Sequence, residues 1–342
     1  MNKTKGTEIA TLGEFGLIDR LTKRLAKRNN TTLKAAGDDA AVIDLGDEVL
    51  LLTSDMMTEG VDFDLSYFPL KHLGYKAIVR GVNDILAMNG RAEQVTVSLG
   101  VSAKISVEAL DDLYEGMETA CGELGVDIVG GDTTASMNGL IINISVVGRA
   151  KKEDVVYRSG AKEHDLICIT SNLGAAYMGL HLLEREKRVL KDVENPEPKF
   201  AGHEYLLERY LKPRARQNVL KALEEQGIRP TSMIDLSDGL ASDLRQICLA
   251  SQCGARIYLE RIPIARQTSE LAEEMHIDPV IAALNGGEDH ELMFTVPIDM
   301  QEKIMALGLV DVIGHITREE AGVILVTPDG EGIALKAQAF DR

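Results

Sequence analysis

The chain has 342 residues, of which 54 are acidic and 37 basic, so its formal net charge is −17. This charge excludes a surface built to bind the phosphate backbone of nucleic acids or an anionic membrane. The apolar fraction of 45% is typical of globular proteins and excludes a wholly disordered chain. At about 150 residues per domain, the length predicts two domains.

Neither the start of the chain nor its cysteines indicate export or membrane insertion. Residues 1–21 lack the apolar stretch of a secretory signal. No run approaches the ~18 apolar residues that a membrane helix needs. The cysteines form no CxxC pair, and we expect them to be buried thiols in a reducing compartment; they are Cys121, Cys168, Cys248 and Cys253. These observations predict a cytoplasmic protein.

The first part of the chain predicts alternating helices and strands. Thr11 and Glu14 fit a capping box that opens a helix reaching about Arg28. The polar residues 31–37 predict a loop. Helices are expected over residues 72–88 and 110–124, with Gly125 ending the second. Strands are expected over residues 40–43, 49–53, 95–101, 126–129 and 140–148.

A polar segment over residues 153–164 places the domain boundary, so we expect domains over residues 1–150 and 151–342. Residues 191–203, which contain two prolines, predict a loop or an excursion. Strands are expected over residues 165–170, 232–236, 255–259, 291–296, 310–316 and 323–326, and helices over residues 214–226 and 239–253. The mixture without a fixed repeat predicts an α/β or α+β fold.

Several carboxylates stand where a metal site could form. Three predicted strands end in aspartate: LLLTSD at Asp55, DIVGGD at Asp132 and SMIDLSD at Asp238. Asp39 lies in a loop and Asp84 in the apolar segment VNDILAM. Mg²⁺ takes oxygen ligands from several directions, so this pattern predicts a magnesium site. Neighbouring hydroxyls would add ligands, from Thr53, Ser54 and Ser237.

Each of these aspartates also has a simpler interpretation. An aspartate at a strand end is often a turn residue or a helix N-cap. Asp84 lies four residues after Arg80, which is compatible with an ion pair on a helix surface. The recurrence of five such positions favours the metal site over turns alone.

A glycine pair and an arginine indicate phosphate binding. The segment Gly130-Gly131-Asp132-Thr133-Thr134 follows a predicted strand, and small residues let backbone N–H groups approach a phosphate. The planar guanidinium of Arg158 suits phosphate oxygens, although a surface arginine fits the same position. The chain has no GxxxxGK[ST] loop and no GxGxxG after a strand, so a nucleotide would be bound by another architecture.

Seven segments resemble the thiamine-monophosphate kinase family, in that family's order and over nearly the whole chain. They are GDDAAV (37–42), TSDMMTEGVDF (53–63), GYKAIVRGVNDILAMNG (74–90), IVGGDTT (128–134), YRSGAK (157–162), IDLSDGLASDL (234–244) and GGEDHELMFTV (286–296). IDLSDGL followed by GGED-x-EL is the most specific combination. The aspartate-bearing strands alone also fit the wider superfamily of aminoimidazole-ribonucleotide synthetase and selenophosphate synthetase.

The resemblance implies two domains and a homodimer. The N-terminal mixed sheet would form a barrel with that of a second subunit, and the C-terminal domain would be an α/β sandwich. ATP and several Mg²⁺ ions would lie between the domains. The implied reaction is magnesium-assisted, in-line phosphoryl transfer from ATP to thiamine monophosphate, giving thiamine diphosphate.

The resemblance also assigns site residues. The implied metal ligands, among which Asp55, Asp84 and Asp235 are the catalytic ones, are Asp39, Thr53, Ser54, Asp55, Asp84, Asp132, Asp235 and Asp238. The implied ATP contacts are Tyr114, Gly131, Asp132, Arg158 and Ser237. The implied substrate contacts are Asp62, Glu288 and Phe340. The chain departs from the family at Asp62, where many relatives carry histidine.

Two other functions remain open from the residues. One is a related ATP-dependent synthetase that acts on another acceptor. The other is a non-catalytic module that binds magnesium and nucleotide. The GGEDHEL segment favours the kinase over both, since the alternatives need only the metal residues.

Overall fold

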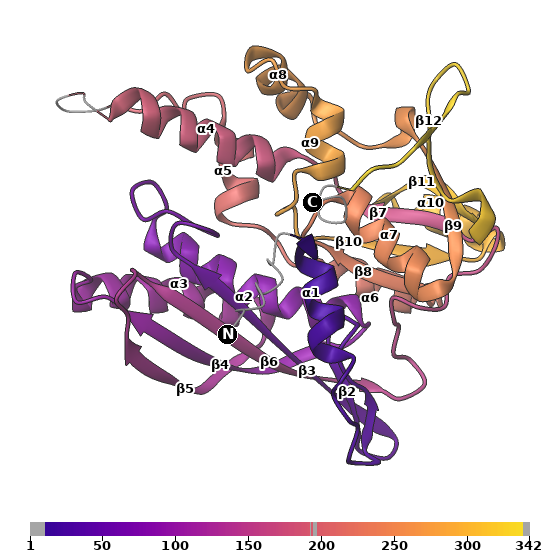
Figure 1. The fold of residues 1–342 in the computed structure, drawn as a ribbon, viewed down its shortest axis with the longest axis horizontal. Coiled ribbons are helices and arrows are strands. Elements are labelled where there is room, and N and C mark those ends of the chain that lie inside the picture. Colours follow the sequence, from indigo (N-terminus) through magenta and orange to yellow (C-terminus); the bar gives the residue numbers. More distant parts are fainter. Residues whose placement is uncertain (1–10, 192, 194–196, 338–342) are drawn as a thin grey trace, which may run out of the picture.

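The computed structural model describes residues 11–191, 193 and 197–337. It has a two-domain, mixed α/β fold in which each domain contains one sheet (Figure 1). Of the two predicted fold classes, α/β and α+β, the structure has the second, because almost all neighbouring strands are antiparallel. No helix in the described ranges is both long and apolar enough to cross a bilayer.

The N-terminal sheet has six strands in the order β1-β2-β3-β6-β4-β5. Only β4 and β5 pair in parallel. The strands are β1 (Thr32–Lys34), β2 (Ala41–Asp44), β3 (Glu48–Thr58), β4 (Arg91–Val101), β5 (Asp127–Ala135) and β6 (Ile141–Lys151). The three helices of this part are α1 (Gly13–Thr22), α2 (Leu70–Ala87) and α3 (Val107–Leu124).

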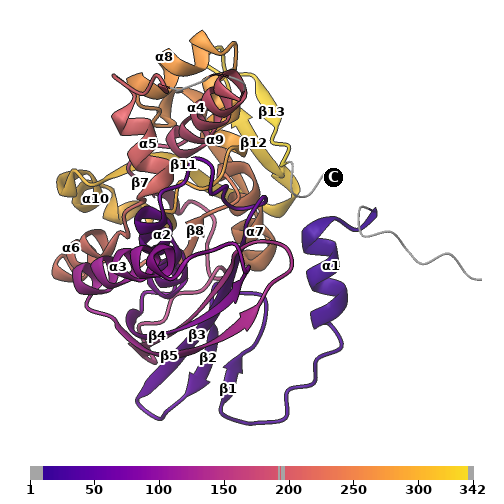
Figure 2. The same cartoon turned by 90° about the vertical axis from the view of Figure 1, so that its left-hand side faces the viewer.

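Helices α2 and α3 lie on one face of this sheet and leave the other face open (Figure 2). Side chains alternate between the faces of a strand, so Val49, Leu51 and Thr53 of β3 are buried beneath the helices. On the open face Leu52 is 40% exposed and Met56 59% exposed. The six strands form an open sheet, and the described part of this chain contains no closed barrel.

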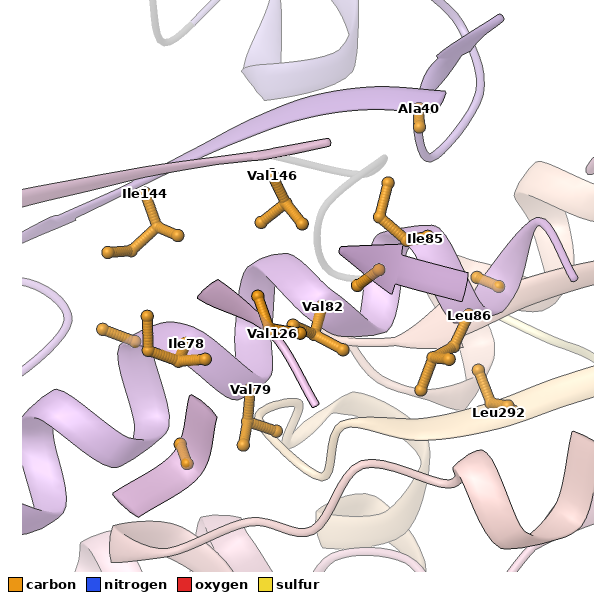
Figure 3. Packing of buried hydrophobic residues seen from close by; sticks show 14 of the residues in the cluster. Ala40, Ile78, Val79, Val82, Ile85, Leu86, Val126, Ile144, Val146 and Leu292 are labelled. Atoms are coloured by element: carbon orange, nitrogen blue, oxygen red, sulfur yellow. The ribbon is translucent and has the colours of Figure 1, made fainter. Parts of the chain in front are cut away.

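Helix α2 runs through the middle of the molecule. Thirteen of its eighteen residues are buried, which marks a helix covered on nearly all sides. Figure 3 shows it between Ile144 and Val146 of β6 on one side and Leu292 on the other. Leu292 belongs to the C-terminal sheet, so one apolar core joins the two domains through α2.

The C-terminal sheet has seven strands in the order β13-β12-β9-β11-β7-β10-β8, and only β12 and β9 pair in parallel. The strands are β7 (Leu166–Thr170), β8 (Ser232–Leu236), β9 (Cys253–Tyr258), β10 (Glu291–Val296), β11 (Val310–Arg318), β12 (Val323–Val326) and β13 (Gly332–Ala334). The helices are α4 (Ala175–Leu190), α5 (Glu204–Leu211), α6 (Gln217–Glu225), α7 (Leu240–Ser251), α8 (Arg266–Glu274), α9 (Pro279–Asn285) and α10 (Gln301–Leu307).

Most predicted elements are present, with differences at the start of the chain. Strands β8, β10 and β12 have the predicted bounds, and the four cysteines are free thiols. The capping box is wrong, because α1 starts at Gly13 behind the N-cap Leu12 and ends at Thr22, well before Arg28. The predicted loop over residues 31–37 contains β1, whose pairing with β2 outweighs its polar sequence.

Two glycines set the distance between α2 and α3. A Cβ added at Gly116 of α3 would lie 1.8 Å from the carbonyl oxygen of Lys71, and one added at Gly74 of α2 would lie 1.9 Å from that of Leu113. The two helix backbones therefore meet at positions where no side chain fits.

We expect Gly116→Ala to destabilise the protein by about 2–3 kcal/mol, because the helices must separate to admit the methyl group. Gly122→Ala on the same helix is the matched control, since its Cβ would meet nothing within 4 Å. It should stabilise the protein by about 0.5–1 kcal/mol through higher helix propensity. Urea denaturation of both variants measures the two effects, and equal stabilities would contradict this account.

Candidate functional site

Three carboxylates from distant parts of the chain meet where the two domains join. Asp39 lies in the loop before β2, Asp84 on α2 and Asp235 on β8, and one oxygen of each lies within 4.8 Å of the others. Asp39 is 8% exposed and Asp235 5% exposed. The surface ion pair considered for Asp84 and Arg80 is therefore wrong, because Asp84 faces the other two aspartates.

Burial raises the pKa of all three carboxyls, and the charges of neighbouring carboxylates add to each shift. Burial raises the pKa of Asp39 to about 6, even though Arg158 favours its charged form. The pKa of Asp84 lies well above its usual range through burial and the charges of Asp235, Asp39 and Asp55. Burial and the charge of Asp39 raise the pKa of Asp235 in the same way. The protein alone leaves this negative charge poorly compensated.

Two side chains hold the cluster in place. Arg158 donates to Oδ1 of Asp39 from Nε at 3.2 Å and from Nη2 at 2.5 Å. The hydroxyl of Thr53 donates to Oδ2 of Asp84 at 2.5 Å. Oδ2 of Asp39 is buried and accepts no hydrogen bond from the described residues. An acceptor in this state is the position where a hard cation would be expected to bind.

The donor set fits a magnesium ion. All three residues offer carboxylate oxygens, which Mg²⁺ prefers, and a bound cation would lower the raised pKa values. Asp55 and Asp238 lie close enough for their charges to act on the cluster, since Asp55 raises the pKa of Asp84 and Asp238 that of Asp235. Six of the predicted metal residues therefore lie on one side of the N-terminal sheet: Asp39, Thr53, Asp55, Asp84, Asp235 and Asp238.

Ser54 and Asp132 lie on the other face of that sheet. Ser54 pairs with Ser145, and Asp132 pairs with Ser98, which in turn faces Asn143 of β6. Both predicted metal ligands are exposed there and are separated by the sheet from Asp84. Among the predicted ATP contacts, Gly131 lies against Val97 of β4 on this edge, and Tyr114 is exposed on α3.

The GGED segment has an unusual backbone next to the carboxylate cluster. Glu288 has φ 63° and His290 has φ 51°, values that residues with a side chain rarely adopt. The Glu288 N–H donates to the carbonyl of Ser237 at 2.8 Å, and the His290 N–H donates to that of Leu236 at 2.9 Å. These bonds place Glu288 directly beside the SDG turn that follows β8.

Asp289 anchors this segment from the opposite side. Its carboxylate accepts hydrogen bonds from the N–H groups of Gly174 at 2.7 Å and Ala176 at 3.2 Å, at the start of α4. Burial raises the pKa of Asp289 to about 6, although Arg209 opposes the shift. Hydrogen bonds to the turn after β8 and to the start of α4 thus hold the segment, and Glu288 is its residue that faces the site.

Glu288 faces two cations, Lys76 and Arg80, to which the sequence analysis gave no role in the site. Lys76 is fully buried, and its Nζ lies 2.7 Å from Oε2 of Glu288 and 3.9 Å from the centre of the Tyr210 ring. Burial lowers the pKa of Lys76. Although burial alone would raise the pKa of Glu288, Lys76 and His290 hold it well below its usual range. Glu288 is therefore charged at neutral pH.

Arg80 is the second cation. It donates to Asp55 from Nε at 2.8 Å and from Nη2 at 3.1 Å, and to Asp62 from Nη1 at 3.2 Å. Its Nη1 lies 3.8 Å from Glu288. The spacing of Lys76, Arg80 and Asp84 was the available signal, because polar residues four apart share one face of a helix.

The remaining predicted residues have different environments. Asp62 accepts a hydrogen bond from the Thr58 N–H at 2.7 Å as well as from Arg80. Asp243, which the sequence analysis left out, accepts a bond from the Asp238 N–H at 3.2 Å and so orders the turn after β8. Phe340 lies outside the described residues.

Comparison with known proteins shows the same architecture. The family models described as AIR synthase related protein, N-terminal domain and C-terminal domain, match residues 37–150 and 162–327. The thiamine-monophosphate kinase of Aquifex aeolicus is 33% identical over 84% of this chain and 86% of its own length. The Escherichia coli K12 enzyme of the same name is 31% identical over 96% of this chain and 98% of its own.

A solved structure described as AaThiL complexed with AMPPCP and TMP has a TM-score of 0.82 and 30% identity, and covers 96% of this chain and 97% of its own. The structure of the Stenotrophomonas maltophilia thiamine-monophosphate kinase has a TM-score of 0.73 at 27% identity, covering 94% of this chain and 98% of its own. With these relatives and both matched domains, the chain belongs to the thiamine-monophosphate kinase family.

Proposed function

We propose that this protein transfers the terminal phosphoryl group of ATP to thiamine monophosphate, giving ADP and thiamine diphosphate. The observation that carries the proposal is the cluster of Asp39, Asp84 and Asp235 beside the charged Glu288. A cation site next to an acceptor site is what phosphoryl transfer between two anions requires. The AMPPCP and TMP bound in AaThiL support the same pair of substrates.

In the proposed transfer, the phosphate oxygen of thiamine monophosphate attacks the terminal phosphorus of ATP. The bond from that phosphorus to ADP breaks as the new P–O bond forms. The attacking oxygen is already anionic at neutral pH, so the site needs no strong general base. Catalysis then depends mainly on holding the two substrates in line and on charge compensation.

Asp39, Asp84 and Asp235 would hold Mg²⁺, and Asp55 and Asp238 would extend the set. When bound, Mg²⁺ supplies the positive charge that offsets the repulsion between the phosphate groups. Arg158 and Ser237 would contact ATP, since Arg158 already bonds Asp39 and Ser237 lies next to Asp238. Glu288 would face the positively charged rings of the acceptor, because its own charge is maintained by Lys76.

The proposal assigns residues 1–150 to ATP and metal binding and to dimerisation, and residues 151–342 to the C-terminal domain. A second copy would cover the open face of the N-terminal sheet and complete a barrel. The exposed Leu52 and Met56 support this, because a partner would remove their apolar surface from water. Ser54 and Asp132 on the same face would then also become part of an enclosed site.

A product assay tests the reaction directly. The protein is incubated with ATP, Mg²⁺ and thiamine monophosphate, and thiamine diphosphate and ADP are measured. Thiamine and an aminoimidazole ribonucleotide precursor serve as alternative acceptors. ADP release with the precursor and not with thiamine monophosphate would contradict the proposal, and nucleotide binding without any product would indicate a non-catalytic module.

Asp84→Asn and Asp235→Asn should each reduce product formation by at least ~10²-fold, the loss expected when an electrostatic stabiliser is removed. The metal-free variants should melt at the wild-type temperature or above it at pH 8. The raised pKa values mean that protonation favours the folded state, and asparagine mimics the protonated carboxyl. Asp112→Asn, on the exposed surface of α3, is the control. Normal turnover in both cluster variants would refute the metal assignment.

Glu288→Gln should weaken thiamine monophosphate binding by about tenfold while leaving ATP binding unchanged, because only the acceptor loses a charged contact. It should also lower the melting temperature, since Lys76 would remain buried without its carboxylate. Adding Lys76→Met should recover stability without recovering acceptor affinity. Calorimetry and thermal denaturation separate the two effects, and equal loss of both ligands would place Glu288 outside the acceptor site.

Met56→Glu should convert the proposed dimer into a monomer, because it places a charge in the surface that the partner covers. Val107→Glu is the control, since Val107 is 70% exposed at the start of α3, away from the open face. Sedimentation velocity measures the oligomeric state. A monomeric wild-type protein at micromolar concentration would count against the proposed interface.

A further inference from the structure

Arg80 contacts Asp55, which lies next to the proposed cation site, and also Asp62 and Glu288, which are proposed to face the acceptor. Its guanidinium binds both oxygens of Asp55, whose charge acts on Asp84 and Asp235. On its other side it bonds Asp62 and lies 3.8 Å from Glu288. Arg80 therefore lies between the two groups of residues that, under the proposed function, hold the phosphates and the acceptor rings.

Arg80 lies between Glu288 and Asp55, whose charge acts on the carboxylate cluster. If the rings of thiamine monophosphate face Glu288 and its phosphate approaches the carboxylate cluster, the phosphate passes Arg80. The side chain of Arg80 is 15% exposed, whereas that of Lys76 is fully buried. Of the two cations that face Glu288, only Arg80 can reach a ligand from solvent.

The guanidinium also has donors left for a ligand. Arginine carries five N–H donors, and Arg80 uses three of them on Asp55 and Asp62 within the described part of the chain. The remaining two project from the Nη1 and Nη2 nitrogens. A planar guanidinium held by two carboxylates presents such donors in a fixed orientation, which suits the oxygens of a phosphate.

We propose that Arg80 binds the phosphate of the acceptor and thereby selects a phosphorylated acceptor over the free alcohol. Asp55 and Asp62 act as positioning residues that hold the guanidinium. This inference rests on the proposed function, because it takes the acceptor's orientation from it. The local carboxylates Asp55, Asp62 and Glu288 exceed Lys76 and Arg80 by one charge, so acceptor binding should also require Mg²⁺.

The test compares three ligands by calorimetry in the presence of Mg²⁺ and AMPPCP. Arg80→Met should weaken thiamine monophosphate binding by about 10- to 100-fold, the value of lost charged hydrogen bonds. The affinity for free thiamine should stay the same or rise, because Glu288 loses a neighbouring cation. Inorganic phosphate should lose affinity in parallel with thiamine monophosphate. Arg80→Lys keeps the charge but lacks the planar guanidinium, so its affinity for thiamine monophosphate should fall between those of wild type and Arg80→Met.

Folding is controlled separately. Arg80→Met leaves Asp55 and Asp62 without their cation, so Arg80→Met with Asp62→Asn serves as a second variant with less unpaired charge. Lys71→Met, an exposed change on the same helix, should leave all three affinities unchanged. Thermal denaturation confirms that each variant is folded before binding is measured.

The outcomes separate this inference from the proposed function. If wild type makes thiamine diphosphate and Arg80→Met loses affinity for thiamine monophosphate and thiamine by the same factor, or for neither, the role of Arg80 is refuted alone. If wild type neither binds nor converts thiamine monophosphate, the proposed function fails. Inorganic phosphate then decides: lower phosphate affinity in Arg80→Met supports the assignment, and equal affinity overturns it.

Discussion

The site depends on a polar stripe carried by a helix that is buried on nearly all sides. Lys76, Arg80 and Asp84 lie on one face of α2, between two sheets, where a charge without a partner would be strongly unfavourable. Each charge therefore needs an opposite charge from another element: Glu288 from the loop before β10 for Lys76, and Asp55 of β3 for Arg80. The Lys76–Glu288 pair joins the two domains beside the place of the proposed chemistry, and the Arg80–Asp55 pair holds α2 against its own sheet.

Asp84 is the exception on this stripe, because it faces two further carboxylates and no cation of its own. The hydroxyl of Thr53 and the guanidinium of Arg158 offset only part of the resulting repulsion. In the metal-free protein the carboxylates therefore repel one another at the place where a divalent cation would relieve the repulsion. The acceptor side is different, since Glu288 is already compensated by Lys76, so the two halves of the site differ in what they require from a ligand.

The sequence alone predicted two domains, most strands, and Asp39 and Asp84 as metal ligands, because carboxylates in a glycine-rich loop or an apolar segment leave a local pattern. Asp235, the third member of the cluster, was assigned only through the family resemblance. The sequence did not predict helices α4, α5 and α8, whose apolar stripes are interrupted by charged residues, or α9 and α10, which have only seven residues each. It also missed the roles of Lys76 and Arg80, since a basic residue on a helix ordinarily faces solvent. Only the packing of β8 and β10 against α2 shows that these side chains are enclosed.

The separation of Ser54 and Asp132 from the cluster shows the limit of a residue pattern in another way. Asp55 and Asp132 were expected at strand ends, but both lie inside longer strands, and the alternation of side chains along β3 puts Thr53 and Asp55 on one face and Ser54 on the other. Which face a residue takes is settled by the helices that cover the sheet. A pattern that treats neighbouring residues as one ligand set cannot make this distinction.

Because Lys76 and Asp84 belong to one helix, eight residues of α-helical rise, about 12 Å, separate the lysine that pairs with Glu288 from the aspartate of the carboxylate cluster along the axis. The backbone hydrogen bonds of the helix fix that spacing, so loop movement cannot adjust it. Variants that accept a longer or shorter acceptor would therefore have to change side chains along this face, with Arg80 midway, while the backbone stays the same.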